Sequence, residues 1–336
     1  MERQELKSSA FFFEAISKFR TPLMGLATLN VMLLHIFQNF ELLGSDVIFY
    51  VFESGADLFM LLSGFGLFYS VDKGGSLGSY FKKRFLRIYP EYIIACVASG
   101  ILLAKGTVWV IKDLTTLSFW MNASTTYWFI ALIVVLYLIY PFIHKHIRKS
   151  DTFSIILIAV TVLANLILPF VLVWDYWARV IAFERIPVFF AGAFLAKKIK
   201  YDSISIRKER VLYFLIVAMA ALILSVRTPA GFYRLVLLPW TVCVAVLAAF
   251  VFDRCKKGNV VVKGMELLGK ISLQVYLFHG FLMEFLLLKL VPLASNKPLM
   301  ILITTLQTLL VAVIVKLICD KFRQLLSKPA KKAYNS

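Results

Sequence analysis

The sequence of 336 residues has few charged residues and few residues that commonly bind metals. Only 17% of the residues are charged, whereas 60% are hydrophobic and the mean hydropathy is +0.82. A water-soluble fold cannot bury that much apolar surface, so a soluble domain is excluded. Four cysteines show no CxxC pairing or metal-ligand spacing, which predicts no disulfide. His144 and His146 stand beside Lys145 in a predicted loop and are interpreted as anchors, so no metal site is predicted.

The chain also lacks internal repeats, low-complexity tracts and polar segments long enough to fold alone. No small-residue cleavage site follows the apolar run 23–37, so the N-terminal part is interpreted as a retained first helix and not as a signal peptide. The organisation predicted from these absences is one transmembrane domain over residues 1–336. Its function therefore lies within the membrane or at its surfaces.

What the sequence does have is a series of apolar runs of roughly 17 to 25 residues, the length that crosses a bilayer as a helix. The fold class predicted is an all-α, polytopic integral membrane helix bundle with about ten transmembrane helices. We expect them near residues 21–40, 47–71, 88–105, 126–143, 152–173, 180–196, 211–226, 235–252, 268–288 and 298–318.

Positive charge gathers in alternate loops. The net charge is +18, and a nucleic-acid binder would concentrate it on one face or tail. Here, 29 of the 37 Lys and Arg residues fall in the segments that are cytoplasmic if the N-terminus is inside. This distribution follows the positive-inside rule, so both termini are predicted to be cytoplasmic, including segment 1–20 and a basic tail at 319–336. The predicted location is the inner cell membrane, with membrane lipids and no nucleic acid as partners.

Two of the first helices carry ionisable residues, which are costly in hydrocarbon and therefore functional candidates. His35 lies about fifteen residues, or ~22 Å, above the inner boundary near Arg20. Glu53, Asp57 and Gly64 form one stripe on the second helix, at a depth compatible with His35. A His35–Asp57 pair would orient an imidazole base. The alternatives are a histidine satisfied by packing, a purely structural ion pair, and glycines that serve close helix packing.

Later segments add three further groups of candidates. Ser272, Tyr276 and His279 share one face of the expected helix 268–288, together with Gly269, and favour a polar-lined cavity. Arg84 and Arg87 lie in a basic run that either anchors the chain at lipid head groups or forms a fork for phosphate. Glu184 and Arg185 precede Pro187 at the start of a helix, either as a solvated rim pair or as groups that orient a polar acceptor.

Five motifs occur in an order that resembles the acyltransferase type 3 family, and they cover nearly the whole chain. They are His35, the segment Gly55 to Phe65, the segment Tyr80 to Pro90, Trp128 with Tyr137 and Pro141, and the segment Leu268 to His279. Two positions depart from the family pattern. Met24 stands where the family has Arg or Lys, with Arg20 one turn below, and Ile133 and Val134 replace a pair of glutamates.

The resemblance implies transfer of an acyl group, often acetyl, from cytoplasmic acyl-CoA to a hydroxyl of a cell-envelope carbohydrate. Acyl-CoA would be a co-substrate and no metal would be needed. A homodimer is left open. The roles carried over are a base, its orienting carboxylate, cations for the phosphates of coenzyme A, and groups for the oxyanion and the acceptor. These roles fall to His35 and Asp57, to Arg84 and Arg87, and to Ser63, Tyr276, His279, Trp128, Glu184 and Arg185.

Two other classes of protein remain open at this point. A transporter or flippase of a small polar or lipid-linked solute would use the same buried polar residues, although no paired halves are visible in the sequence. A noncatalytic scaffold or sensor would tolerate the loss of both His35 and Asp57 without any effect beyond stability.

Overall fold

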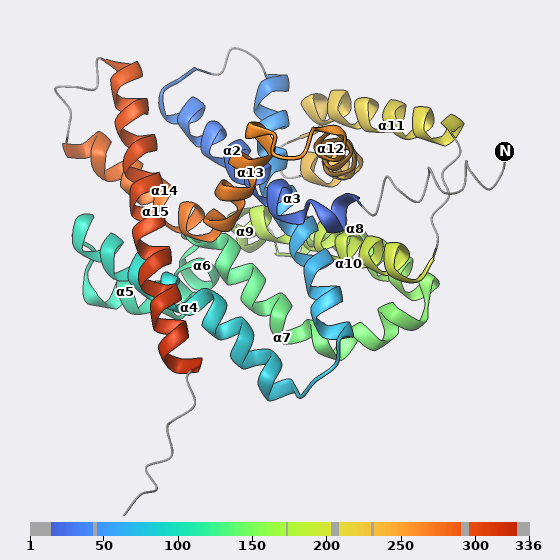
Figure 1. The fold of residues 1–336 in the computed structure, drawn as a ribbon, viewed down its shortest axis with the longest axis horizontal. Helices are drawn as coiled ribbons and strands as arrows, with labels where there is room; N and C mark the ends of the chain where they lie inside the picture. Colours follow the sequence, from blue (N-terminus) through green and yellow to red (C-terminus); the bar gives the residue numbers. More distant parts are fainter. Residues whose placement is uncertain are drawn as a thin grey trace, which may run out of the picture. The chain divides into compact units, whose positions relative to one another are not determined.

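The computed structural model describes residues 15–42, 46–172, 174–202, 208–229, 232–289 and 296–327. Every regular element in these ranges is a helix, which confirms the all-α prediction (Figure 1). Seven of these helices are long and apolar enough to cross a membrane, or up to eight if α13 and α14 count as one broken span. The chain is therefore a multi-pass membrane protein. This count covers the described residues alone, among which Tyr213–Arg227 of α11 is a shorter apolar helix.

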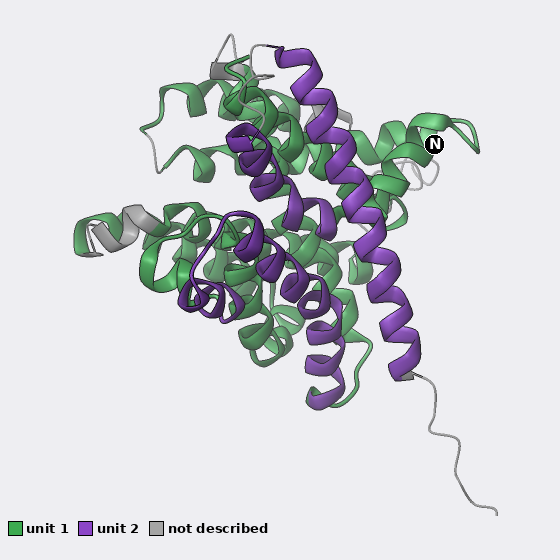
Figure 2. Ribbon diagram, turned by 90° about the vertical axis from the view of Figure 1, so that its left-hand side faces the viewer, with its two compact units in different colours: residues 1–77, 116–272 green, residues 78–115, 273–336 purple. Residues whose placement is uncertain are grey.

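The chain forms two compact units, shown in green and purple in Figure 2. Unit 1 comprises Met1–Leu77 and Thr116–Ser272, and unit 2 comprises Gly78–Thr115 and Leu273–Ser336. The helices of unit 1 are α2 (Arg20–Asn39), α3 (Asp46–Asp72), α6 (Leu117–Asn122), α7 (Trp128–Lys149), α8 (Asp151–Leu172), α9 (Trp174–Phe183), α10 (Ile186–Tyr201), α11 (Lys208–Arg227), α12 (Tyr233–Arg254) and α13 (Val260–Lys270). Those of unit 2 are α4 (Leu77–Leu102), α5 (Thr107–Leu114), α14 (Ser272–Lys289) and α15 (Lys297–Ser327). The first residues of α4 and α14, Leu77 and Ser272, still belong to unit 1.

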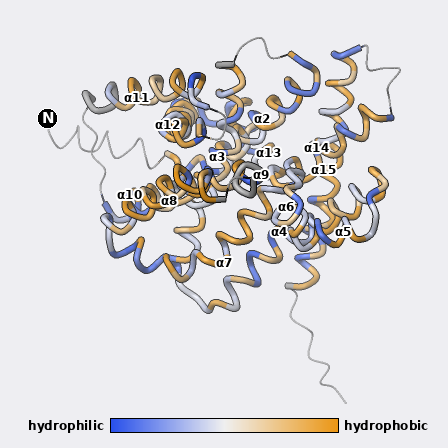
Figure 3. The backbone as a smooth tube through the Cα atoms, turned by 180° about the vertical axis from the view of Figure 1, so that it is seen from behind, coloured by the Kyte–Doolittle hydropathy of each residue, from blue (hydrophilic) through white to orange (hydrophobic). Residues whose placement is uncertain are grey.

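Helix α3 is the central helix of unit 1. It packs against α2, α7, α10, α11 and α12, and 78% of its apolar window is buried, against 17% for α8 and 22% for α15. Figure 3 colours much of α8 and α15 as hydrophobic. Apolar side chains exposed along a helix of this length suit contact with lipid, whereas α3 is surrounded by protein. Polar side chains on α3 therefore face other helices.

Glycines allow α3 and α10 to approach with their backbones in contact. A Cβ added to Gly64 would lie 1.9 Å from the carbonyl oxygen of Phe189, and one added to Gly192 would lie 2.0 Å from that of Leu61. Neither position accepts a larger residue unless the helices separate. The interpretation of Gly64 as a packing residue is therefore confirmed.

The same kind of contact joins α2 to α13. A Cβ on Gly25 would lie 1.9 Å from the carbonyl oxygen of Met265, and one on Gly269 would lie 1.9 Å from that of Thr21. The expected continuous helix over 268–288 is wrong, because α13 ends at Lys270 and α14 begins at Ser272. Gly269 packs on α2, whereas Tyr276 and His279 belong to unit 2, so the polar face predicted along one helix is divided.

One end of α3 is tied to α7 and α10 through Asp72, whose side chain is 1% exposed. Its carboxylate lies 3.2 Å from Nε2 of His144 and 3.4 Å from Nε of Arg148. Lys200 and the hydroxyl of Tyr201 also donate to it. The predicted loop is wrong at His144, because this residue is buried within α7 and links the ends of α7 and α3.

Helix α4 begins much earlier than expected. The basic run after Tyr80 is helical, because α4 starts at Leu77 and continues through Pro90 to Leu102. The hydroxyl of Tyr92 donates to the carbonyl of Asp113, and Lys105 pairs with the Asp113 carboxylate at 3.1 Å. These contacts fold α5 back onto α4 within unit 2.

Candidate active site

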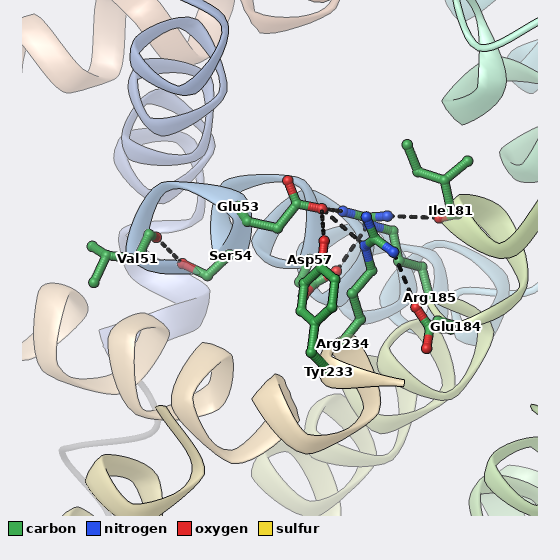
Figure 4. Close-up of polar contacts among 9 residues, drawn as sticks. All are labelled: Val51, Glu53, Ser54, Asp57, Ile181, Glu184, Arg185, Tyr233 and Arg234. Atoms are coloured by element: carbon green, nitrogen blue, oxygen red, sulfur yellow. Dashed lines mark hydrogen bonds and ion pairs between the residues drawn. The ribbon is translucent and has the colours of Figure 1, made fainter. Parts of the chain in front are cut away.

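Six polar side chains of unit 1 converge on α3, and we call them the Glu53 cluster (Figure 4). Its members are Glu53 and Asp57 from α3, Glu184 and Arg185 from the corner between α9 and α10, and Tyr233 and Arg234 from the start of α12. Glu53, Asp57 and their partners come from three separate parts of the sequence. Contacts with α10 and α12 therefore position the site, and α3 supplies its centre.

Glu53 is the residue on which the cluster converges. Its Oε1 accepts from Nη2 of Arg185 at 2.7 Å and from Nε of Arg234 at 2.9 Å. The hydroxyl of Tyr233 donates to the same oxygen at 3.3 Å. Because Glu53 is 6% exposed, two guanidinium groups compensate for a carboxylate that has little access to water.

Asp57 lies one turn along α3, and its ion-pair partner is Arg185, with Nε 2.9 Å from Oδ1. Asp57 is 0% exposed and Arg185 is 1% exposed. The guanidinium of Arg185 also lies 4.6 Å from the ring centroid of Trp128. The sequence analysis expected His35 as the partner of Asp57, but the structure gives this role to Arg185. The reason is that the α9–α10 corner is inserted against α3.

Glu184 and Arg185 are fully buried, so the alternative of a solvated pair at the rim is wrong. They precede α10 as expected, with Pro187 in its first turn. Nη1 of Arg234 lies 3.1 Å from Oε2 of Glu184, so Arg234 joins Glu184 to Glu53. Sequence reasoning missed Arg234, because an arginine between apolar runs looks like any loop charge. Its position just before the expected helix 235–252 was the only signal in the sequence.

The cluster has more carboxylates than cations: three acidic residues face Arg185 and Arg234. Within the described parts of the chain, Oδ2 of Asp57 and Oε1 of Glu184 are buried and accept no hydrogen bond. Buried carboxylate oxygens strongly favour a donor, so these two atoms are suited to bind hydroxyl groups or to share a proton.

His35 is half-buried on α2. The side chain of Asn39 donates to the backbone carbonyl of His35 at 2.8 Å, so Asn39 serves the helix end. A Cβ on Gly55 would lie 2.6 Å from the Asn30 side chain, which shows how closely α2 and α3 approach near this level. His35 thus lies on α2, a helix that packs against α3, which carries Glu53 and Asp57.

Ser63 is buried on α3, six residues beyond Asp57 and therefore ~9 Å farther along the helix axis. In the described part of the chain, Ser63 is not one of the six residues that form the Glu53 cluster. Nε and Nη2 of Arg20 donate to the carbonyl of Leu62 at 3.1 and 3.0 Å, close to Gly66. These contacts place the Arg20 guanidinium against the middle of α3, whereas Asp57 lies more than one turn away along that helix.

The remaining candidates belong to unit 2. Arg84 is half-buried with its guanidinium 5.5 Å from the ring centroid of Tyr80, and Arg87 is exposed. His279 is buried, and its Nδ1 lies 3.0 Å and 2.8 Å from the carbonyl oxygens of Val275 and Tyr276. Since a carbonyl only accepts, Nδ1 carries a proton.

Comparison with known proteins decides the family. The model of the family described as "Acyltransferase domain" matches residues 23–317, which is most of the chain and includes residues of both units. The chain belongs to this acyltransferase family.

A more limited similarity links this acyltransferase family member to a named protein. It is 27% identical over 109 residues to "Acyltransferase MdmB" of Streptomyces mycarofaciens, and the match covers 27% of this chain and 28% of that protein. The chain thus matches less than a third of the length of this curated relative. No solved structure matches. All members of the Glu53 cluster, with His35, Arg84 and Arg87, lie within the family match.

Proposed function

We propose that this protein is a membrane acyltransferase that moves an acyl group, most simply acetyl, from cytoplasmic acyl-CoA to a hydroxyl of a cell-envelope carbohydrate. The observation that carries the proposal is the buried Glu53 cluster on α3, with His35 on the adjoining helix α2, in a chain that belongs to an acyltransferase family. A base and unpartnered carboxylate oxygens inside an apolar bundle suit the activation of a hydroxyl group.

His35 is the base in this proposal. It takes the proton of the acceptor hydroxyl, and the hydroxyl oxygen attacks the thioester carbonyl carbon. The carbon–sulfur bond then breaks, the ester forms, and the proton passes from His35 to the sulfur, which leaves as the thiol of coenzyme A. Glu53 stabilises the imidazolium that forms in between, and Arg185 and Arg234 hold Glu53 in place.

The other groups receive roles that follow from their chemistry. Arg84 and Arg87 bind phosphates of the donor, since arginine forks match phosphate oxygens. Ser63, Tyr276 and His279 are the candidates for donating to the tetrahedral oxyanion. Oδ2 of Asp57 and Oε1 of Glu184 accept hydrogen bonds from hydroxyl groups of the carbohydrate acceptor. Among the described residues, no donor of the protein bonds to either oxygen.

Arg185 and Trp128 support this acceptor side. The Trp128 ring stacks on the guanidinium, which in turn holds Asp57, so neither side chain needs to touch the carbohydrate. The proposed setting is the inner membrane with the donor on the cytoplasmic side, in agreement with the charge of the loops.

The test measures transfer from radiolabelled acetyl-CoA to native envelope glycans in membranes that hold the full chain. His35→Ala is compared with the parent and with His146→Ala, an exposed histidine that undergoes the same chemical change. We expect His35→Ala to lose at least about a hundredfold in rate, the usual contribution of a general base. His146→Ala should behave as the parent.

Two results would contradict the proposal. Equal labelling by the parent and His35→Ala removes His35 from the reaction. No labelling by the parent with acetyl-CoA or longer acyl-CoA donors would favour a transporter, in which the Glu53 cluster binds a solute.

A further inference from the structure

Helix α4 contains a proline whose effect on the backbone is compensated from another helix. Pro90 has no N–H group, so the carbonyl of Leu86, four residues earlier, has no partner within the helix. Nε of Arg323, on α15, donates to this carbonyl oxygen at 2.8 Å. Arg323 thus supplies the hydrogen bond that Pro90 removes.

The other nitrogens of the same guanidinium extend this contact. Nη2 of Arg323 pairs with Oε1 of Glu91 and lies 3.4 Å from the carbonyl oxygen of Arg87. Nη1 lies 2.8 Å from the carboxylate of Asp320, one turn earlier on α15. Arg323 therefore contacts three residues of α4 that lie close to Pro90, namely Leu86, Arg87 and Glu91.

Glu91 ties a third helix into this arrangement. Its side chain is 1% exposed and also accepts from Nε2 of Gln274, on α14, at 3.0 Å. A carboxylate with so little access to water requires a compensating charge, and Arg323 provides it. The three helices α4, α14 and α15 of unit 2 meet at this point.

Arg84 and Arg87, the proposed donor-binding residues, lie just before this junction. Glu91 follows Arg84 by seven residues and Arg87 by four, so the three share one side of α4. A proline in a helix interior allows the two halves to bend relative to each other. The contacts of Arg323 determine the direction of the half that carries Arg84 and Arg87.

We propose that Arg323 is a positioning residue for donor binding, which fixes the basic half of α4 by capping the Leu86 carbonyl and neutralising Glu91. This inference rests on the proposed function, because it takes Arg84 and Arg87 as ligands of the donor phosphates. Arg323 lies on α15 beyond residues 23–317, the part that matches the family.

The first experiment measures the binding of coenzyme A to the purified full chain in nanodiscs, and the KM and kcat for acetyl-CoA. The variants are Arg323→Gln and Glu91→Gln, and the matched control is Lys321→Gln, which removes an exposed charge from the same turn of α15. We expect Arg323→Gln to weaken coenzyme A binding and raise KM about tenfold, with kcat reduced less than about threefold. Glu91→Gln should cause a smaller change in the same direction, and Lys321→Gln none.

A second change separates positioning from a general loss of stability. Pro90→Ala restores the N–H group that can bond to the Leu86 carbonyl within the helix, so it should remove part of the Arg323→Gln defect in coenzyme A binding. Amide exchange of residues 84–91 should be faster in Arg323→Gln and slower again in the double variant. A double variant that binds no better than Arg323→Gln overturns the capping argument.

The outcomes distinguish this inference from the proposed function. Transfer by the parent with an unchanged KM in Arg323→Gln overturns the role of Arg323 and leaves the function standing. If coenzyme A binds the parent about tenfold more tightly than Arg323→Gln but no acyl transfer is detected, the role of Arg323 stands and the proposed reaction is overturned. A parent that does not bind coenzyme A overturns both.

Discussion

Replacing Arg185 by methionine should destabilise unit 1 strongly. The guanidinium is 1% exposed and pairs with Glu53 at 2.7 Å and Asp57 at 2.9 Å. Methionine keeps much of the volume but leaves Asp57 without its ion-pair partner and Glu53 with the cation of Arg234 and the hydroxyl of Tyr233. Breaking a buried pair in this way costs about 3–5 kcal/mol. The lost contact with the Trp128 ring adds up to about 2 kcal/mol.

The expected total of about 5 kcal/mol corresponds to a decrease in Tm on the order of 10 °C. Thermal unfolding can be followed in detergent through the reaction of Cys243 with a maleimide dye, in a background that lacks the other three cysteines. Cys243 is 2% exposed on α12, so it reacts when unit 1 opens. The control is Arg227→Met, an exposed arginine of the same unit, which should change Tm by less than about 2 °C.

A triple variant tests whether charge causes the loss. Glu53→Gln, Asp57→Asn and Arg185→Met together remove two carboxylates and one guanidinium, so little uncompensated charge remains buried. We expect the triple variant to be more stable than Arg185→Met alone. A single variant within about 1 kcal/mol of the parent, or a triple variant less stable than the single one, would refute the reasoning.

Three further changes test the packing of the two units. Gly192→Leu should abolish folding, as seen by loss of the monodisperse species in detergent, because its Cβ would lie 2.0 Å from the Leu61 carbonyl oxygen. Gly280→Ala, where nothing lies within 4 Å of the new Cβ, should raise stability by up to about 1 kcal/mol, and a decrease in Tm would contradict this. Asp72→Asn should lower Tm and leave the rate of acyl transfer per folded molecule unchanged. Asp72 contacts His144 at one end of α3, far along that helix from Asp57. A lower rate per folded molecule would contradict this purely structural role.

Much of the centre of unit 1 could be predicted from the sequence. The spacing of Glu53, Asp57 and Gly64 places them on one stripe of a helix, and apolar length identifies the helix itself. The partner of Asp57 could not be predicted in this way. Arg185 and Arg234 are far from α3 in the sequence, and only the packing of α10 and α12 on α3 brings them together.

The ends and breaks of helices were the other limit. No proline marks the interruption at Ile271, which lies inside the segment 268–288 that was expected as one helix. The helix ends there while Gly269 packs on α2, a tertiary contact that no local pattern contains. Similarly, the basic run before Pro90 is helical since Arg323 and other residues of unit 2 hold it, although its charge made it look like a loop.

The glycine contacts of unit 1 also limit how this protein can move. In both pairs the contacts are reciprocal, because each helix offers one glycine and one carbonyl oxygen to the other: Gly64 with Phe189 and Gly192 with Leu61, repeated in kind between α2 and α13. Between such backbones there is no side chain that can change rotamer and make room. Neither helix of a pair can therefore slide or roll past its partner, so the two helices of each pair move together as one rigid body. Any opening that admits substrate to unit 1 therefore has to separate one helix pair from its other neighbours, and not the two helices of a pair from each other.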